Sequence, residues 1–175
     1  MADEDTIDDR LAKDPLLVDA SPTKSFFVSI ITRDVQLDDA IADLVDNCVD
    51  GAKRLRKDGD LKGLWVKIVV GADGFSIEDN CGGIPLEIAR RYAFKFGRDG
   101  DYQDSDYSVG QFGVGMKRTL FKLGTKFSVS TVEPEHSYKI EVPVEDWLID
   151  PKWDFHVSEL VSGNSAPIRS APRSS

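Results

Sequence analysis

The sequence has few of the residues that build disulfide scaffolds or paired metal sites, with only two cysteines and two histidines among 175 residues. Cys48 and Cys81 stand in apolar or glycine-rich runs without a C-x-x-C pair, so we expect buried free thiols in a reducing compartment. No apolar run approaches the ~18 residues of a membrane span. The first ten residues, MADEDTIDDR, are acidic where a secretory signal requires a basic and then apolar start. We therefore expect a cytoplasmic protein without membrane contact.

Basic residues are also in deficit, because 22 Lys and Arg stand against 31 Asp and Glu and leave a net charge of −9. An acidic surface gains little from counterion release at a phosphate backbone, so we expect no direct nucleic-acid binding. A small anionic ligand remains compatible with this charge, because backbone N–H groups and a divalent cation can hold it locally. The composition, 41% hydrophobic and 30% charged, is typical of a globular protein.

Local composition divides the chain into three segments. Residues 1–22 are acidic and lack apolar periodicity, which predicts a flexible N-terminal arm. Residues 23–155 are long enough for one domain with its own core. Residues 156–175 are rich in Ser, Pro and Gly, which predicts a disordered tail.

Hydrophobic periodicity and turn residues predict the elements of this domain. We expect strands at 26–32, 64–70, 75–79, 126–132 and 137–142, helices at 37–57, 86–96 and 116–123, and a polar lid at about 97–109. The order differs from the alternating βαβ pattern of parallel-sheet proteins. It predicts an α/β sandwich in two layers, with a mixed, mostly antiparallel sheet and helices on one face.

The helix expected at 37–57 has a polar stripe opposite its apolar side. Asp43, Asn47 and Asp50 share this stripe when residues are placed at 100° intervals. The amide oxygen of an asparagine can ligate Mg²⁺, and a carboxylate one turn away can orient or deprotonate a water. A solvated acidic face is the alternative interpretation.

Two glycine-containing motifs follow. Asp79 ends a predicted strand before Gly82 and Gly83, where a carboxylate could accept a hydrogen bond from an exocyclic amine; an ordinary turn is the alternative. The motif GQFGVGMK, residues 110–117, precedes a predicted helix and could direct N–H groups at an anion. It lacks the Gly-Lys-Ser/Thr of a Walker A loop, and no βαβ unit surrounds it as in a dinucleotide fingerprint.

Taken together, the three motifs resemble those of the GHKL superfamily, which contains gyrase, the large heat-shock chaperone, histidine kinases and MutL. DLVDNCVDGA (43–52) resembles the N-box E-L-x-x-N-x-x-D-A, and DNCGGI (79–84) resembles D-x-G-x-G. GQFGVG (110–115) is most similar to the glycine motif of the heat-shock chaperone branch. The resemblance extends from about residue 26 to 142 and implies a Bergerat fold with an ATP lid.

The resemblance also implies a role for each matching residue. Asp43 stands at the position of the catalytic base, Asn47 at that of the Mg²⁺ ligand, and Asp79 at that of the carboxylate that binds the adenine amine. The remaining positions implied to bind nucleotide are Asp50, Gly83, Ile84, Gly110, Gln111, Phe112, Gly113, Val114, Gly115 and Lys117. ATP and Mg²⁺ are the expected cofactors.

Three departures from the family pattern affect the expected function. Asp43 is one methylene shorter than the usual glutamate, and Cys81 replaces the first glycine of the second motif. We also find no further strand after Trp153, as in a domain cut from a longer protein.

We therefore expect Mg²⁺-dependent ATP binding with slow hydrolysis, in which lid closure couples nucleotide state to a protein partner, to further domains or to a nucleotide-dependent homodimer. A nucleotide-gated binding module without hydrolysis is the main alternative. A phosphotransfer kinase fits less well, because both histidines, His136 and His156, lie downstream of the motifs.

Overall fold

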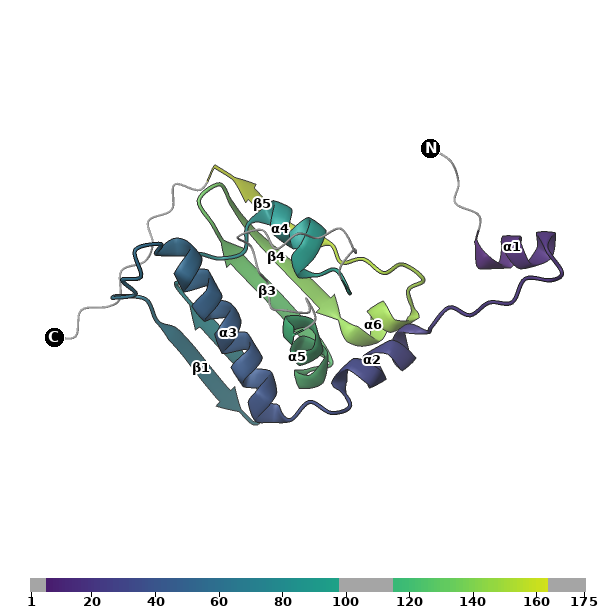
Figure 1. Cartoon of the computed structure of the whole chain (residues 1–175), viewed down its shortest axis with the longest axis horizontal. Helices are drawn as coiled ribbons and strands as arrows, with labels where there is room; N and C mark the ends of the chain where they lie inside the picture. Colours follow the sequence, from purple (N-terminus) through teal and green to yellow (C-terminus); the bar gives the residue numbers. More distant parts are fainter. Residues whose placement is uncertain (1–5, 98–114, 164–175) are drawn as a thin grey trace.

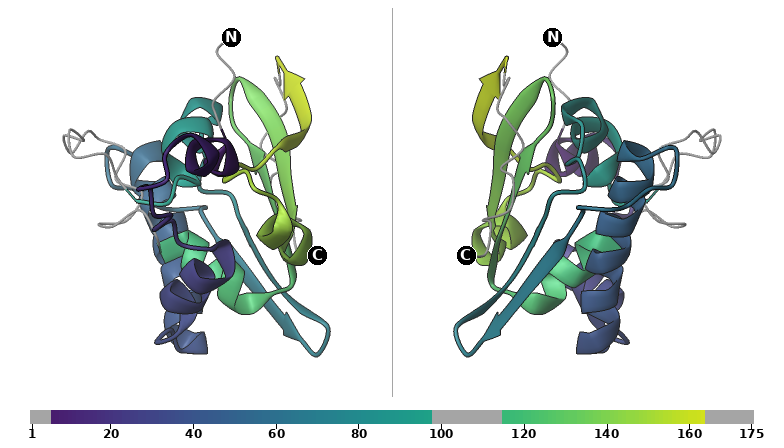
Figure 2. Two further views of the ribbon diagram at one scale, coloured as in Figure 1. Left: turned by 90° about the vertical axis from the view of Figure 1, so that its right-hand side faces the viewer. Right: turned by 90° about the vertical axis from the view of Figure 1, so that its left-hand side faces the viewer.

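The computed structural model describes residues 6–97 and 115–163, and its helices gather on one side of its strands (Figures 1 and 2). This arrangement confirms the α/β sandwich expected from the sequence. The helical layer consists of α2 (Lys24–Thr32), α3 (Leu37–Leu55), α4 (Leu86–Ile88) with the π-helical turn η1 (Ala89–Ala93), and α5 (Gly115–Leu123). The shorter helices α1 (Ile7–Lys13) and α6 (Val144–Ile149) lie in the N-terminal arm and directly after β4.

The described strands form two antiparallel sheets. β1 (Val66–Gly71) and β2 (Gly74–Asp79) make a hairpin in which Val66 pairs with Asp79 and Gly71 with Gly74. β3 (Lys126–Val132), β4 (His136–Pro143) and β5 (Val157–Ser162) follow one another in the second sheet. These pairings confirm the hairpins predicted at 64–79 and 126–142. Each hairpin joins antiparallel neighbours, which need only a short connection.

The main core lies between the second sheet and the helices and is rich in aromatic rings. The rings of Phe121 and Trp147 are 5.1 Å apart, and Phe155 lies 5.5 Å from Trp147. The buried Lys24 joins this cluster from α2: its ammonium lies 4.0 Å from the centre of the Trp147 ring and donates to the Trp147 carbonyl at 2.7 Å. This cation–π contact and hydrogen bond fasten the start of α2 to α6.

The prediction of a strand at 26–32 is wrong, because this segment is helix α2. Its run of aromatic and β-branched residues is typical of a strand, but the Thr23 side chain caps a helix by accepting from the Phe26 amide at 3.3 Å. The helical turn places Val28 and Ile31 together against the core. Tertiary packing therefore overrides the local β propensity.

The chain after residue 155 also differs from the expectation. Residues 157–162, expected within a disordered tail, form strand β5, which pairs with β4 from Ile140↔Val157 to His136↔Ser162. Five of the six β5 residues are exposed, so the segment lacks the buried alternation that identifies a strand in sequence. This is the further strand that we did not find after Trp153.

Two helical expectations are corrected in detail. The helix expected at 86–96 ends at Ala93, after a π-helical turn. The N-terminal arm contains α1, which is capped by the reciprocal bonds of Thr6 and Asp9 and buries no residue. Capping supports this helix, and the division of the chain into 1–22, 23–155 and 156–175 otherwise remains a sequence prediction.

Candidate functional site

Helix α3 carries the first motif and confirms the amphipathic helix expected there. Its buried residues recur about every fourth position, and the polar stripe faces away from them. The helix ends at Leu55, two residues before the expected end. Buried residues on the packing side are Ala40, Leu44, Cys48, Gly51 and Ala52.

Asp43 on this helix contacts the beginning of α5. Its Oδ2 accepts hydrogen bonds from Arg118 Nε at 2.9 Å and Nη2 at 2.7 Å, and its side chain is 25% exposed. A Cβ placed on Gly115 would lie 3.6 Å from Asp43 Cγ, so the Asp43 side chain lies against the start of α5. Thr119 strengthens this junction by donating to the Ala40 carbonyl at 3.1 Å. The structure therefore brings the first motif to the last glycine of the third.

Asn47 is oriented by its own helix. Its Nδ2 donates to the Asp43 carbonyl at 2.8 Å, which fixes the direction of the amide group. The amide oxygen is consequently the atom that remains for a ligand. Asn47 lines the hollow described below.

Asp79 lies at the end of β2 and contacts the other side of α3. Its Oδ1 accepts from the Cys81 amide at 2.7 Å, and its Oδ2 accepts from Cys48 Sγ at 3.4 Å. A Cβ on Gly51 would lie 2.9 Å from the Cys81 carbonyl oxygen, so only glycine permits this approach of α3. The first and second motifs thus meet along one helix.

Both cysteines lie in this junction. Burial, followed by the negative charge of Asp79, raises the pKa of Cys48 to about 12, and burial raises that of Cys81. Cys48 and Cys81 are free thiols, as expected. Cys81 has no positive φ, whereas Gly82 and Gly83 have φ values of +104° and +69°, so the cysteine fits the turn without strain.

The turn after Asp79 is held against β3. A Cβ on Gly83 would lie 2.5 Å from the Val132 carbonyl oxygen, which excludes any larger residue without a backbone shift. The next residue, Ile84, accepts a hydrogen bond at its carbonyl from the Tyr138 hydroxyl at 2.8 Å. Burial raises the pKa of Tyr138 to about 12, so this hydroxyl remains a donor at neutral pH. The loop that precedes α4 is thereby fixed.

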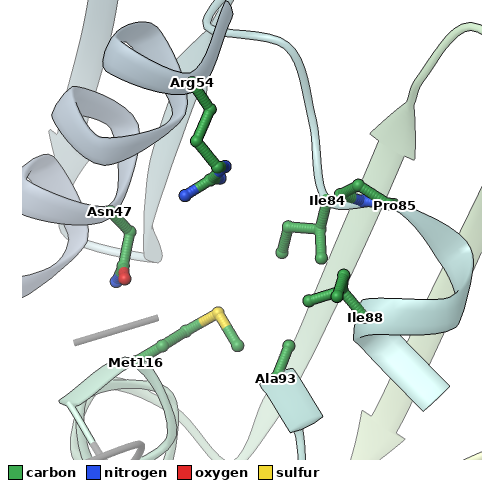
Figure 3. Close-up of a pocket in the computed structure, with 7 residues that line it drawn as sticks. All are labelled: Asn47, Arg54, Ile84, Pro85, Ile88, Ala93 and Met116. Atoms are coloured by element: carbon green, nitrogen blue, oxygen red, sulfur yellow. The ribbon is translucent and has the colours of Figure 1, made fainter. Parts of the chain in front are cut away.

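A hollow opens between α3, α4 and α5 (Figure 3). It encloses about 430 Å³, including the space at its opening to solvent. Asn47 and Arg54 reach into it from α3, and Ile84 from the opposite side. The remaining lining residues are Pro85, Ile88, Ala93 and Met116.

Lys117 and Asp50 both contact other residues of the chain. Lys117 is 1% exposed, and its ammonium donates to the carbonyls of Ala93 at 3.0 Å and Lys95 at 2.5 Å. Through these bonds Lys117 helps to fix the end of η1. Its contact with a phosphate stays a prediction. Asp50 lies 3.7 Å from Lys53 on the surface of α3 and does not line the hollow.

The remaining third-motif positions lie outside the described residues. These are Gly110, Gln111, Phe112, Gly113 and Val114, together with positions 98–109 of the expected lid. Gly115 is therefore the glycine of this motif whose position the structure gives.

Two arginines of the site were missed in the sequence. Arg54 follows Asn47 by seven residues, so helical spacing alone could have placed it on the same face. Arg118 pairs with a residue 75 positions earlier, and no local signal predicts such a contact. The Arg118 contact becomes visible only when α5 is packed on α3.

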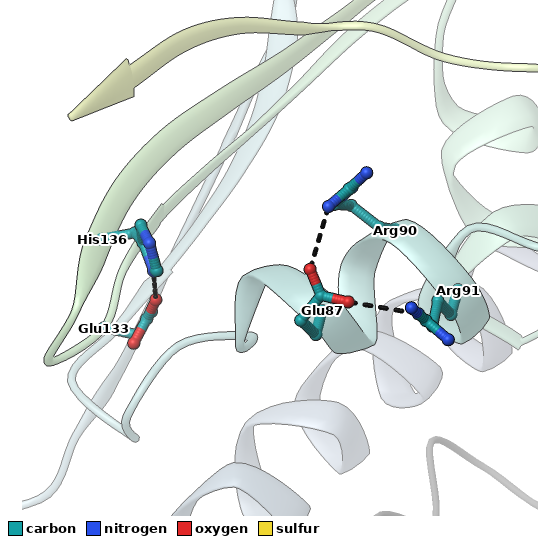
Figure 4. A network of polar contacts seen from close by, with 5 residues as sticks. All are labelled: Glu87, Arg90, Arg91, Glu133 and His136. Atoms are coloured by element: carbon teal, nitrogen blue, oxygen red, sulfur yellow. Dashed lines mark hydrogen bonds and ion pairs between the residues drawn. The ribbon is translucent and has the colours of Figure 1, made fainter. Parts of the chain in front are cut away.

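Charged residues on α4 and η1 pair with one another. Glu87 accepts from Arg90 at 2.9 Å and from Arg91 at 3.1 Å, and none of the three lines the hollow (Figure 4). The same view shows His136 Nδ1 at 2.6 Å from Glu133 Oε1 where β4 begins. Exposed pairs such as those of Glu87 contribute little to stability, about 1 kcal/mol or less.

Comparison with known proteins agrees with this geometry. Residues 35–161, more than two-thirds of the chain, match the family described as histidine kinase-, DNA gyrase B-, and HSP90-like ATPase. The matched range begins just before α3 and ends within β5, so it contains every element of the site. No curated protein matches the chain. In the described part of the chain, no helix combines the length and apolarity needed to cross a bilayer.

The match supports the superfamily and does not single out the heat-shock chaperone branch. The chain belongs to the histidine kinase-, DNA gyrase B-, and HSP90-like ATPase family and contains a GHKL-type ATP-binding domain.

Proposed function

We propose that this domain binds ATP with Mg²⁺ in the hollow beside α3 and hydrolyses it slowly. The observation that carries the proposal is that α3 contacts both other motifs: Cys48 binds Asp79, and Asp43 lies against Gly115. A nucleotide lying along this helix could then reach the strand-end carboxylate with its base and the start of α5 with its phosphates.

The side chains present fit the metal. Asn47 directs its amide nitrogen at the Asp43 carbonyl, which leaves its oxygen, a ligand type that Mg²⁺ accepts. The described residues contain no cluster of three or more His, Cys, Asp or Glu that could hold a metal ion. A cation bound by one protein oxygen together with phosphates and waters needs no such cluster. When bound, Mg²⁺ would neutralise phosphate charge.

Asp43 would orient and deprotonate the attacking water. Its Oδ2 accepts both Arg118 bonds, so Oδ1 is the oxygen proposed to accept from the water. Arg118 already occupies one oxygen of this carboxylate, and aspartate reaches less far than glutamate. Both features support slow turnover.

The same pair supports the second candidate, a nucleotide-gated binding module without hydrolysis. The Arg118–Asp43 ion pair would then serve only to join α5 to α3. A phosphotransfer kinase has less support, because His136 is paired with Glu133 where β4 begins. Lid closure over 97–109, a nucleotide-dependent homodimer, coupling to a partner and a cytoplasmic location all remain sequence predictions.

Binding is tested by titration calorimetry of the purified chain with ATP and ADP, with Mg²⁺ and with chelator. We expect binding that weakens on chelation, that loses at least about tenfold in Asp79→Asn, and that loses its Mg²⁺ dependence in Asn47→Ala. Asp73→Asn, in the exposed β1–β2 turn, is the matched control and should bind as the wild type does. Absence of any heat with either nucleotide would refute the proposal.

A further inference from the structure

Among the described residues that line the hollow, Arg54 is the one that carries a charge. The chain as a whole carries a net charge of −9, so the positive charge at this position is opposite in sign to the net charge. Within the described residues, Arg54 takes part in no hydrogen bond or ion pair, whereas Arg118 is paired with Asp43. Its guanidinium is therefore available to a ligand in the hollow.

The contacts along α3 place Arg54 at one end of the site. Asp43 lies against Gly115, Cys48 contacts Asp79, and a Cβ on Gly82 would lie 3.5 Å from Leu55. α3 therefore runs from the glycine motif, which Asp43 contacts, to the loop that follows Asp79 and contains Gly82, which Leu55 contacts. We call this loop the Asp79 loop. Seven residues separate Arg54 from Asn47, which is about 10 Å along a helix axis. Arg54 thus lies beside the Asp79 loop and far from Asp43 and Gly115.

The wall opposite Arg54 is apolar. Arg54 and Ile84 point into the hollow from opposite sides, and Ile88 lies next to Ile84 (Figure 3). A flat apolar group between them would cover the isoleucines with one face and meet the guanidinium with the other. Guanidinium groups are planar and weakly hydrated, and they stack on aromatic rings more readily than ammonium groups do.

We propose that Arg54 stacks on the purine ring of the bound nucleotide and so recognises the base rather than the phosphates. This inference rests on the proposed ATP binding and specifies one contact within it. Arg54 acts on affinity for the base, which Asp79 alone would otherwise recognise from the ring edge.

The test compares ATP, ADP and AMP binding to the wild type, Arg54→Met and Arg54→Lys by calorimetry or competition. Stacking predicts that Arg54→Met weakens all three by the same factor, about three- to thirtyfold, because the lost contact does not involve phosphate. Arg54→Lys should recover part of the loss, since an ammonium keeps the charge but not the plane. Arg56→Met removes the same charge from an exposed position two residues later and should leave all three affinities unchanged.

Two results would overturn the inference. A loss that grows from AMP to ATP would assign Arg54 to the phosphates, and unchanged affinities would show that it contacts no part of the nucleotide. Either result leaves ATP binding itself intact. If the wild-type chain binds none of the three nucleotides, the proposed function fails as well, so the two failures are distinguishable.

Discussion

At the scale of single residues, the site depends on which atoms are already engaged. Asn47 uses its nitrogen within the helix and Asp43 uses one carboxylate oxygen for Arg118, so each keeps one oxygen for a ligand. The sequence predicted both residues because they share a helical face. It could not predict the engaged atoms, because Arg118 reaches Asp43 only through the packing of α5 on α3.

Turnover distinguishes the two candidate functions at this scale. We expect Asp43→Asn to reduce phosphate release at saturating ATP by roughly 100-fold or more while nucleotide binding persists, because the water loses its base. Asp43→Glu, with one more methylene, should match or exceed the wild-type rate. Asp46→Asn makes the same chemical change at an exposed position on α3 and serves as the control. If Asp43→Asn lowers only the melting temperature, the ion pair is structural and the binding-module function is favoured.

At the scale of elements, prediction succeeded where the local pattern is strong. α3 has the periodicity that its burial requires, whereas the hairpin β1–β2, with five of the six β1 residues exposed, was predicted from its apolar runs and its glycine turn; both lie close to the expected residues. α2 was predicted as a strand because the sequence shows its β-branched residues but not the core beneath Val28 and Ile31. β5 was missed because most of its side chains are exposed and its pairing with β4 depends on backbone groups.

The β3–β4 pair contains a charge group that gives its stability a pH dependence. Lys126 and Lys139 lie 2.5 Å and 2.8 Å from the two carboxylate oxygens of Glu141. Hydrogen bonds from Lys126 and then Lys139 lower the pKa of Glu141 from 4.5 to about 2. Because the folded pKa is depressed, the stabilisation is fully present above about 4.5 and is lost as the pH falls toward 2.

We therefore expect Glu141→Gln to melt at a lower temperature than the wild type at pH 7. The difference should shrink as the pH falls from 5 toward 2, because protonation removes the same charge from the wild type. Thermal melts followed by circular dichroism at several pH values measure it. Glu135→Gln, at an exposed position before β4, is the control, and a difference for Glu141→Gln that stays constant with pH would contradict the assignment.

At the scale of the whole molecule, the two thiols report on opening of the domain. Cys48 and Cys81 are 8% and 4% exposed and lie between α3 and β2. The pKa of Cys48, raised to about 12, leaves almost no thiolate at pH 8. A thiol reagent should therefore label them only when α3 separates from the strand-end loop.

Nucleotide should slow this labelling by mass action. At 100 times its dissociation constant, a ligand that binds only the folded form stabilises it by about 2.7 kcal/mol, which predicts roughly 100-fold slower labelling when opening requires unfolding. A cysteine introduced by Ser21→Cys, in the exposed arm, should react at once with or without ATP. Rapid reaction of Cys48 and Cys81 in native buffer would show that the junction opens without unfolding.

The buried Lys24 has a practical consequence for experiments on this chain. Because its ammonium is held by Trp147 and by the carbonyl of Lys152, the point at which the arm leaves the domain is fixed beside α6. α1 extends outward from that point, clear of the hollow between α3 and α4 (Figure 1). A fluorophore or an immobilisation handle coupled within α1 would therefore leave the entrance to the hollow unobstructed for every titration described above.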